Sequence, residues 1–283
     1  VIEDPELVND YITSGKWDYT DIPIATETEV VIEKAYLVVN GELEGRLQTF
    51  KQEIKALGER GVNIAPAIIT TAELQDEDWS DTWKQYFHTE KPGDRVVIKP
   101  TWEEYEAKED EVVIELDPGA AFGTGTHATT SMCIKELETL VKPDDVVFDI
   151  GTGSGILSII SAKLGARDIQ AVDYDDSVLK IVEENLEQNH VENIVSVAQS
   201  DLMQNVHGKA NLVIANIIAD IIIRLFPQLD EHLEPNGTLL TSGIIEDRID
   251  DVINAGQENG FAVVKRKENK GWACITFKRA NEI

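Results

Sequence analysis

The chain has 283 residues, and its 53 Asp and Glu against 25 Lys and Arg give a formal net charge of −28. This charge disfavours direct nucleic-acid binding, since phosphate backbones attract basic surfaces, and it reflects either a need for solubility or a strongly basic protein partner. Two Cys suggest neither a disulfide framework nor a metal site. The longest apolar stretch (212–226) is interrupted by polar residues and is too short to span a membrane. The opening residues VIEDPE do not have the pattern of a signal peptide. We therefore expect a cytoplasmic protein without metal or membrane contact.

The first 75 residues predict a small domain built on a βαβ unit. The run VVIEKAYLVV at 30–39 predicts a strand, and apolar residues three or four apart predict a helix over 43–60. Gly61 then ends that helix, and APAIITTAEL at 65–74 predicts a second strand.

A linker is expected at 76–110 and a larger domain at 111–283. The linker is rich in Trp and charge, which indicates a segment that packs on another surface rather than a free tether, and strands are predicted at 95–100 and 111–117. In the larger domain, apolar strands alternate with helices, which predicts a doubly wound, mostly parallel α/β sheet. The predicted strands lie at 145–151, 169–173, 194–201, 211–216 and 237–243, followed by an antiparallel hairpin at 261–279. The predicted helices lie at 129–141, 156–165, 175–190, around Pro227 and at 246–260.

The sequence DIGTGSG follows the first strand of that sheet and opens a helix. Gly151, Gly153 and Gly155 allow a tight turn and let a ligand approach the backbone at a helix N-terminus. A dinucleotide fingerprint is GxGxxG, but here the third Gly comes one place early and Ile156 occupies its position. The loop therefore favours a nucleoside ligand that needs no phosphate.

Polar residues also end the following strands. Asp173 ends the second strand and suits the two hydroxyls of a ribose, and Asp201 after the third strand suits an adenine amino group. Asn216 ends the fourth strand. Parallel strands meet ligands at their carboxyl edge, so these side chains are expected together, although each also suits an ordinary acidic turn or helix cap. A ribose, an adenine and no required phosphate point to S-adenosylmethionine rather than NAD.

Three segments carry a family resemblance: DPGAAFGTGTHATT, VFDIGTGSGILSI and ANIIADI. Together with the linker they resemble the ribosomal protein L-eleven methyltransferase family (PrmA) over essentially the whole chain. The resemblance implies an enzyme that transfers methyl groups from S-adenosylmethionine to lysine side chains and the N-terminal amine of one basic, large-subunit ribosomal protein.

The resemblance also implies an architecture and a set of site residues. It implies a Rossmann-like seven-stranded methyltransferase sheet at 111–283, and a ferredoxin-like substrate-recognition domain at 1–75. That small domain is expected to be incomplete, because the family carries a further strand and helix before VIEDP. The cofactor positions carried over by motif are Thr130, Gly151, Asp173 and Asn216.

The glycine-rich segment at 117–130 is expected to serve the cofactor site. It either folds over the bound cofactor as a lid or forms a rigid turn. Phe122 is expected to pack on the cofactor's apolar face, and Thr130 to hold its carboxylate near the start of a helix. His127 suits a hydrogen-bonding strut or, as the alternative, a general base.

Asn216 is the predicted catalytic residue, because a methyl transfer to nitrogen needs a neutral amine. A neutral amide oxygen orients the amine's N–H groups, whereas a carboxylate would stabilise the unreactive ammonium. The alternatives are a methyltransferase acting on another protein or on nucleic acid, an NAD-dependent oxidoreductase, and a cofactor-binding module without catalysis. The fourth strand is followed by IIAD, without the aromatic residue on which a flat base would stack.

Overall fold

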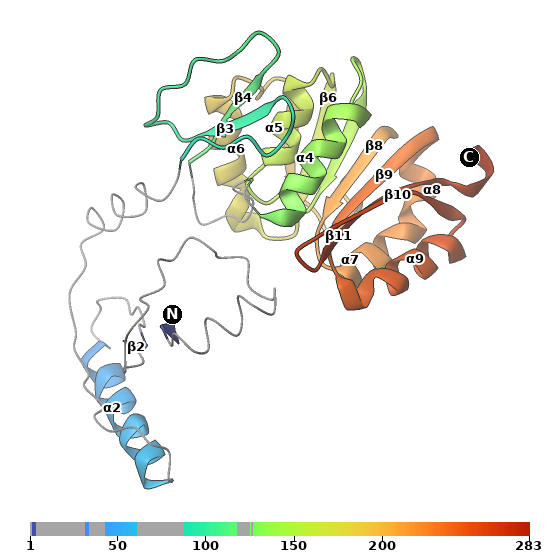
Figure 1. Cartoon of the computed structure of the whole chain (residues 1–283). Coiled ribbons are helices and arrows are strands. Elements are labelled where there is room, and N and C mark those ends of the chain that lie inside the picture. The colour runs from blue at the N-terminus through green and yellow to red at the C-terminus, as the bar shows by residue number, and fades with distance from the viewer. Residues whose placement is uncertain (1, 4–31, 34–42, 61–87, 118–124, 126) are drawn as a thin grey trace. The chain divides into compact units, whose positions relative to one another are not determined.

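The computed structural model describes residues 2–3, 32–33, 43–60, 88–117, 125 and 127–283 (Figure 1). The chain divides into a smaller unit within the first 86 residues and a larger unit that runs from Phe87 to Ile283. In the part of the chain that the structure describes, no helix combines the length and the apolar character that crossing a membrane requires.

The smaller unit contains the predicted helix. It is α2, Leu43–Glu59, and the short strands β1 (Ile2–Glu3) and β2 (Ile32–Glu33) pair antiparallel. The predicted strand at 65–74 and most of the one at 30–39 lie outside the described residues. The βαβ unit therefore stays a prediction.

The larger unit is built on the predicted sheet, whose seven strands follow the order β10-β11-β9-β8-β5-β6-β7. The strands are β5 (Val146–Ile150), β6 (Asp168–Asp173), β7 (Val195–Gln199), β8 (Ala210–Asn216), β9 (Leu233–Ile245), β10 (Phe261–Asn269) and β11 (Trp272–Arg279). Five neighbouring strands run parallel, from β9 to β7, and β11 is antiparallel to both its neighbours. The predicted doubly wound sheet with a terminal hairpin is confirmed.

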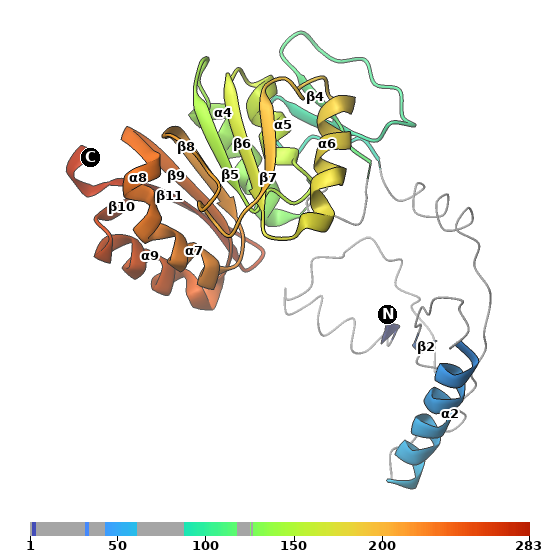
Figure 2. The ribbon, with the colours of Figure 1, turned by 180° about the vertical axis from the view of Figure 1, so that it is seen from behind.

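Helices cover both faces of this sheet (Figures 1 and 2). The first three, which share one buried cluster with the sheet, are α4 (Ala128–Leu140), α5 (Ile156–Lys163) and α6 (Leu179–Gln188). The last three, which line a second cluster, are α7 (Ala219–Leu225), α8 (Leu229–His232) and α9 (Ile249–Glu258). Two separate apolar cores, one on each side, explain why the central strands are apolar on both faces.

Short 3₁₀ turns lie beside these helices. They are η2 (Asp176–Val178), η3 (Phe226–Gln228), η4 (Glu246–Arg248) and η5 (Ala280–Glu282). The helix predicted around Pro227 is divided into α7 and α8 by η3, since proline lacks the N–H that a continuous helix needs. Asp175 caps η2, the turn that leads into α6, because its side chain accepts a 2.9 Å hydrogen bond from Ser177 N.

Residues 88–117 pack as part of the larger unit. Strands β3 (Val96–Lys99) and β4 (Val112–Glu115) pair in parallel, and Val96, Ile98 and Ile114 join the buried cluster of α4 and α5. Asn189 beyond α6 also exchanges hydrogen bonds with the backbone of Glu115, at 2.9 and 2.7 Å. The described part of the predicted linker thus supplies core residues to the larger unit, and the domain boundary predicted at 111 stays a prediction.

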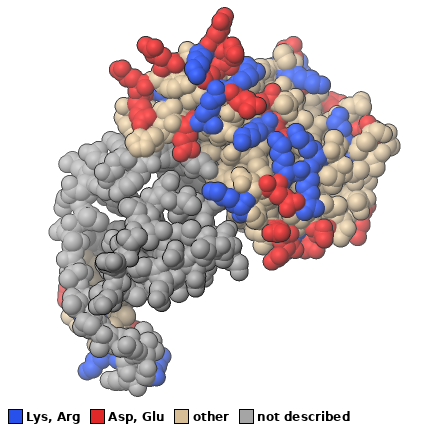
Figure 3. Space-filling model, in the orientation of Figure 1, with Lys and Arg blue, Asp and Glu red and all other residues tan. Residues whose placement is uncertain are grey.

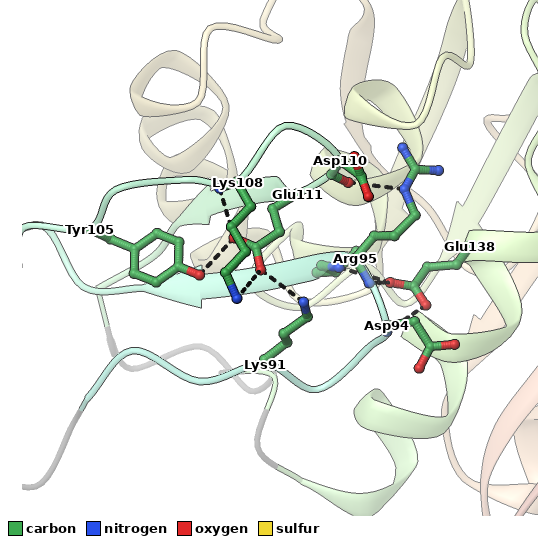
Figure 4. A network of polar contacts seen from close by, with 9 residues as sticks. Lys91, Asp94, Arg95, Tyr105, Lys108, Asp110, Glu111 and Glu138 are labelled. Carbon is green, nitrogen blue, oxygen red and sulfur yellow. Dashed lines mark hydrogen bonds and ion pairs between the residues drawn. The ribbon is translucent and has the colours of Figure 1, made fainter.

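Two carboxylates hold this segment in place (Figure 4). Glu138 of α4 accepts hydrogen bonds of 2.7–2.8 Å from the backbone N–H groups of Asp94, Arg95 and Val96. Glu111 accepts from Lys91 at 2.8 Å and from the Tyr105 hydroxyl at 2.7 Å. These contacts hold the pKa of Glu111 at about 2, so the carboxylate stays charged in the folded protein.

Candidate active site

The glycine loop joins β5 to α5 at the carboxyl edge of the sheet. Gly151, Gly153 and Gly155 all adopt the left-handed conformation, with φ of 76°, 57° and 81°. Side chains other than glycine rarely take these angles, so the three glycines are required by the turn itself. Below the loop, the buried carboxylate of Asp149 accepts hydrogen bonds from Thr152 Oγ1 at 2.8 Å and Ser158 Oγ at 2.6 Å.

Asp149 supports the glycine loop from beneath, a role that was not predicted from the sequence. Burial raises the pKa of its carboxyl, while the Ser158 and Thr152 hydroxyls oppose that rise. The sequence does show an Asp two positions before the first Gly of the loop, which could have indicated this role. Its place under the loop depends on tertiary packing.

The backbone N–H groups of the glycine loop are mostly used inside the protein. Gly151 N and Thr152 N both donate to Val172 O, at 2.8 and 3.0 Å, and Gly155 N donates to Thr152 O at 3.0 Å. Gly153 N donates to Asp173 Oδ2 at 3.0 Å. A pyrophosphate-binding loop needs such groups directed at the phosphate. This loop therefore suits a ligand without one.

Asp173 stands at the end of β6, beside the glycine loop. Its Oδ2 accepts from Gly153 N, and its Oδ1 accepts from Asp175 N at 3.1 Å. An ionised carboxylate has about four acceptor positions, so both oxygens retain capacity for hydroxyl donors. Tyr174 follows it with 76% of its surface exposed, an aromatic neighbour that the sequence analysis did not consider.

Asn216 ends β8 and contacts the first turn of α4. Its Nδ2 donates to the buried Thr130 Oγ1 at 3.4 Å, which joins two predicted site residues that are 86 positions apart. The Asn216 Oδ1 atom is buried, and no donor among the described residues reaches it. An unmatched buried acceptor is costly, and such an atom indicates a place where a ligand donates.

Ile217, the residue after Asn216, is enclosed by two glycines. A Cβ on Gly151 would collide with Ile217 Cγ2, and a Cβ on Gly243 would lie 2.6 Å from Ile217 O. Ile217 N also donates to Ser242 O at 3.1 Å. Gly243 and Ile217 were not predicted as site residues, because this contact between neighbouring strand ends leaves no local pattern in the sequence.

The remaining predicted residues lie as follows. Asp201 forms an ion pair with Arg224 at 3.0 Å, so its proposed adenine contact shares the carboxylate with a guanidinium. Phe122 lies outside the described residues, as does most of the proposed lid, 118–124. His127 caps α4, since its Nδ1 accepts from Thr129 N at 3.3 Å, and its ring meets Trp272 edge-on at 5.3 Å. These contacts are those of a strut.

The structure thus brings Thr130, Asn216, Gly151, Gly153 and Asp173 to one edge of the sheet. Over residues 1–280, the chain matches the family described as "Ribosomal protein L11 methyltransferase (PrmA)". It belongs to that family.

Individual members of the PrmA family match this chain over most of their own length. The chain is 44% identical to the ribosomal protein L11 methyltransferase of Caldanaerobacter subterraneus subsp. tengcongensis, over 99% of this chain and 90% of that protein. It is 46% identical to the protein of the same name from Heliobacterium modesticaldum, over 99% and 89%. The solved ribosomal protein L11 methylase of Lactobacillus delbrueckii subsp. bulgaricus is 36% identical, with a TM-score of 0.64, over 68% of this chain and 99% of that one. The predicted family is confirmed.

Proposed function

We propose that this chain transfers methyl groups from S-adenosylmethionine to amines of ribosomal protein L11, at lysine side chains and at the N-terminal amine. Membership of the PrmA family over residues 1–280 supports the enzyme class and the substrate. The net charge of −28 suits a basic, large-subunit ribosomal protein and disfavours RNA as the direct target. A cytoplasmic location, where ribosomal proteins are made, follows from this substrate, and no membrane contact is proposed.

The residues at the edge of the sheet fit S-adenosylmethionine better than a dinucleotide. The N–H groups of Gly151, Thr152, Gly153 and Gly155 are used inside the protein, which leaves little to bind a pyrophosphate. Asp173 retains acceptor capacity for the ribose hydroxyls. Bound S-adenosylmethionine supplies a methyl group on a sulfonium. The thioether that leaves is neutral, so its departure needs no acid.

Other residues complete the proposed cofactor site. Thr130 lies in the first turn of α4, where helix N–H groups and the helix dipole favour the cofactor's carboxylate. Gly151 and Gly153 let the cofactor approach the backbone, and Asp201 is proposed to contact the adenine amino group. Phe122 and the lid of which it is part remain proposals that rest on the sequence.

The amine of the substrate sets the chemical demand on Asn216. A lysine amine with a pKa of about 10.4 must lose a proton, which costs about 4.6 kcal/mol at pH 7. An N-terminal amine with a pKa of about 8 costs about 1 kcal/mol by the same reasoning. Burial of the amine lowers its pKa, and a neutral acceptor then orients its N–H groups without stabilising the ammonium.

The observation that carries this role is the unmatched Asn216 Oδ1. Its amide nitrogen is directed at Thr130 Oγ1, so the oxygen is the side-chain atom left to accept from a substrate N–H. The residues that follow are Ile217 and Ile218, which offer no aromatic face to a nucleobase. The arrangement therefore favours an amine over a flat base.

Transfer of a labelled methyl group tests the proposal. The full chain is incubated with methyl-labelled S-adenosylmethionine and a mixture of purified ribosomal proteins and ribosomal RNA. We expect the label in L11, on lysine and on the N-terminal amine after mass analysis. Label in another ribosomal protein or in RNA, or no transfer at all, would refute the assignment.

A further inference from the structure

Two turns meet beside Asn216 at the carboxyl edge of the sheet. One turn leads from β8 into the first residues of α7 and contains Ile218 and Asp220. The other comprises residues 245–251 and runs from the end of β9 through η4 into the start of α9. They lie side by side because Asn216 pairs with Ser242 across the strands, and Ile217 packs against Gly243. Both turns form a single surface, which we call the rim.

Arg248 links the two turns of the rim. It donates to Asp220 Oδ1 at 2.7 Å and to Asp251 Oδ2 at 2.6 Å. The hydrogen bond from Arg248 lowers the pKa of Asp220, so this carboxylate remains ionised. A guanidinium that holds both turns makes their relative position well defined.

The rim exposes two large apolar side chains. Ile218 is 63% exposed and Ile245 is 46% exposed, whereas Ala219 and Ile244 are 5% and 0% exposed. Trp272 is the cross-strand partner of Ile245 and extends the apolar surface toward His127. Exposed isoleucines next to an unmatched acceptor indicate a surface that another molecule covers.

The rim is also strongly acidic, and Figure 3 shows Asp and Glu gathered at the edge where α7 and α9 lie. The exposed carboxylates of the two turns are Asp220, Glu246, Asp247, Asp250 and Asp251. The one cation of the 245–251 turn, Arg248, is taken by Asp220 and Asp251. Glu246, Asp247 and Asp250 have no ion pair within the described part of the chain. Their charge is therefore available to a partner.

We propose that the rim docks the segment of the protein substrate that flanks the target amine. The segment's apolar side chain packs on Ile218 and Ile245, and its neighbouring lysines or arginines pair with Glu246, Asp247 and Asp250. A substrate polypeptide that presents an amine to Asn216 Oδ1 must pass next to this surface, because Ile218 lies two positions beyond Asn216. This inference rests on the proposed function and adds the surface that selects a basic, partly apolar segment.

Binding measurements on the full chain test the rim separately from catalysis. L11 is titrated against the protein saturated with S-adenosylhomocysteine, and methyl transfer is followed in parallel. Ile245→Ser and the double variant Glu246→Lys/Asp247→Lys should each weaken L11 binding and raise KM by about tenfold. The affinity for S-adenosylmethionine should stay within about twofold, since neither change touches the glycine loop or Asp173.

Matched controls separate the rim from general effects. Val264→Ser changes an apolar side chain that is 50% exposed on β10, and Glu183→Lys/Glu187→Lys makes the same change in charge on α6. These variants should bind L11 as the unchanged protein does. If the rim variants lose no more affinity than these controls, or if the unchanged protein does not bind L11, the rim proposal is wrong. If L11 binds as expected but receives no methyl group, the proposed function fails while the docking surface stands.

Discussion

Asn216 and Thr130 are joined by a hydrogen bond of 3.4 Å, from the amide nitrogen at the end of β8 to a hydroxyl in the first turn of α4. The bond fixes which end of the amide remains available. The free end is a buried oxygen that no described donor reaches. A side chain oriented in this way is prepared to accept an N–H from a substrate amine.

Replacing Asn216 by Ala should therefore reduce turnover more than cofactor binding. Loss of one preorganised polar contact at a reacting group costs about 10²–10³ in kcat. We expect the affinity for S-adenosylmethionine to fall by no more than about threefold, because Asp173 and the glycine loop remain. Single-turnover rates and calorimetry measure the two effects.

Asn216→Asp provides the matched comparison for that variant. It keeps an oxygen acceptor of the same size but introduces a negative charge, which stabilises the ammonium form of the amine. Its turnover should be as low as that of the Ala variant and should recover partly at higher pH. Turnover close to that of the unchanged protein in both variants would remove Asn216 from the mechanism.

Gly243→Ala should displace Asn216 indirectly. Gly243 has φ of 80°, and an added Cβ would lie 2.6 Å from Ile217 O, so the peptide next to Asn216 must move. We expect a loss of about 1–3 kcal/mol in the free energy of unfolding from strain and overpacking, and a lower kcat at saturating substrate. Gly260→Ala is the control, since Gly260 has the same φ of 80° with nothing within 4 Å of its added Cβ. Equal kcat values in the two variants would contradict the positioning role.

Acid should loosen the segment at 88–117 in a defined pH range. The pKa values of Glu103 and Glu111 are held at about 2, below their ordinary 4.5, chiefly by the Thr89 hydroxyl and the Lys91 ammonium respectively. Depressed carboxyl pKa values stabilise the fold above about pH 4.5, and this contribution is lost as the pH falls toward 2.

Glu111→Gln tests this pH dependence. The variant should unfold at a lower urea concentration at pH 7, and the difference from the unchanged protein should shrink as the pH approaches 2. Glu183→Gln on the exposed surface of α6 is the control and should show no difference at either pH. A difference for Glu111→Gln that is independent of pH would argue against the charged hydrogen bonds.

Most of the fold of the larger unit could be predicted from the sequence. The sequence runs predicted for strands β5 to β9 are largely apolar and close with Gly, Asp or Asn, so the positions of these strands and the carboxyl-edge site followed from local patterns. The ends of β9 did not, because Leu233 and Ile245 extend the strand beyond its apolar centre through pairing with β8 and β11. Pairing of this kind is set by neighbours distant in the chain.

The site was predictable as a set of residue types but not as a set of contacts. Asp173 and Asn216 were recognisable at strand ends. Three other features depend on tertiary packing. They are the ion pair of Asp201 with Arg224, the enclosure of Ile217 by Gly151 and Gly243, and the three backbone N–H groups that donate to Glu138. No local pattern records such contacts, which join residues 23 to 66 positions apart.

Titration of S-adenosylmethionine into the full chain and into its Asp173→Asn variant tests the central claim most directly. The variant keeps an acceptor for Gly153 N but loses the charge, so its fold should survive, as a thermal unfolding curve will check. We predict saturable binding to the unchanged protein and an affinity about 10- to 100-fold weaker in the variant, as expected for a lost hydrogen bond to a charged group. No binding to the unchanged protein, or equal affinity in the folded variant, would contradict the assignment of this edge of the sheet as a methyltransferase site.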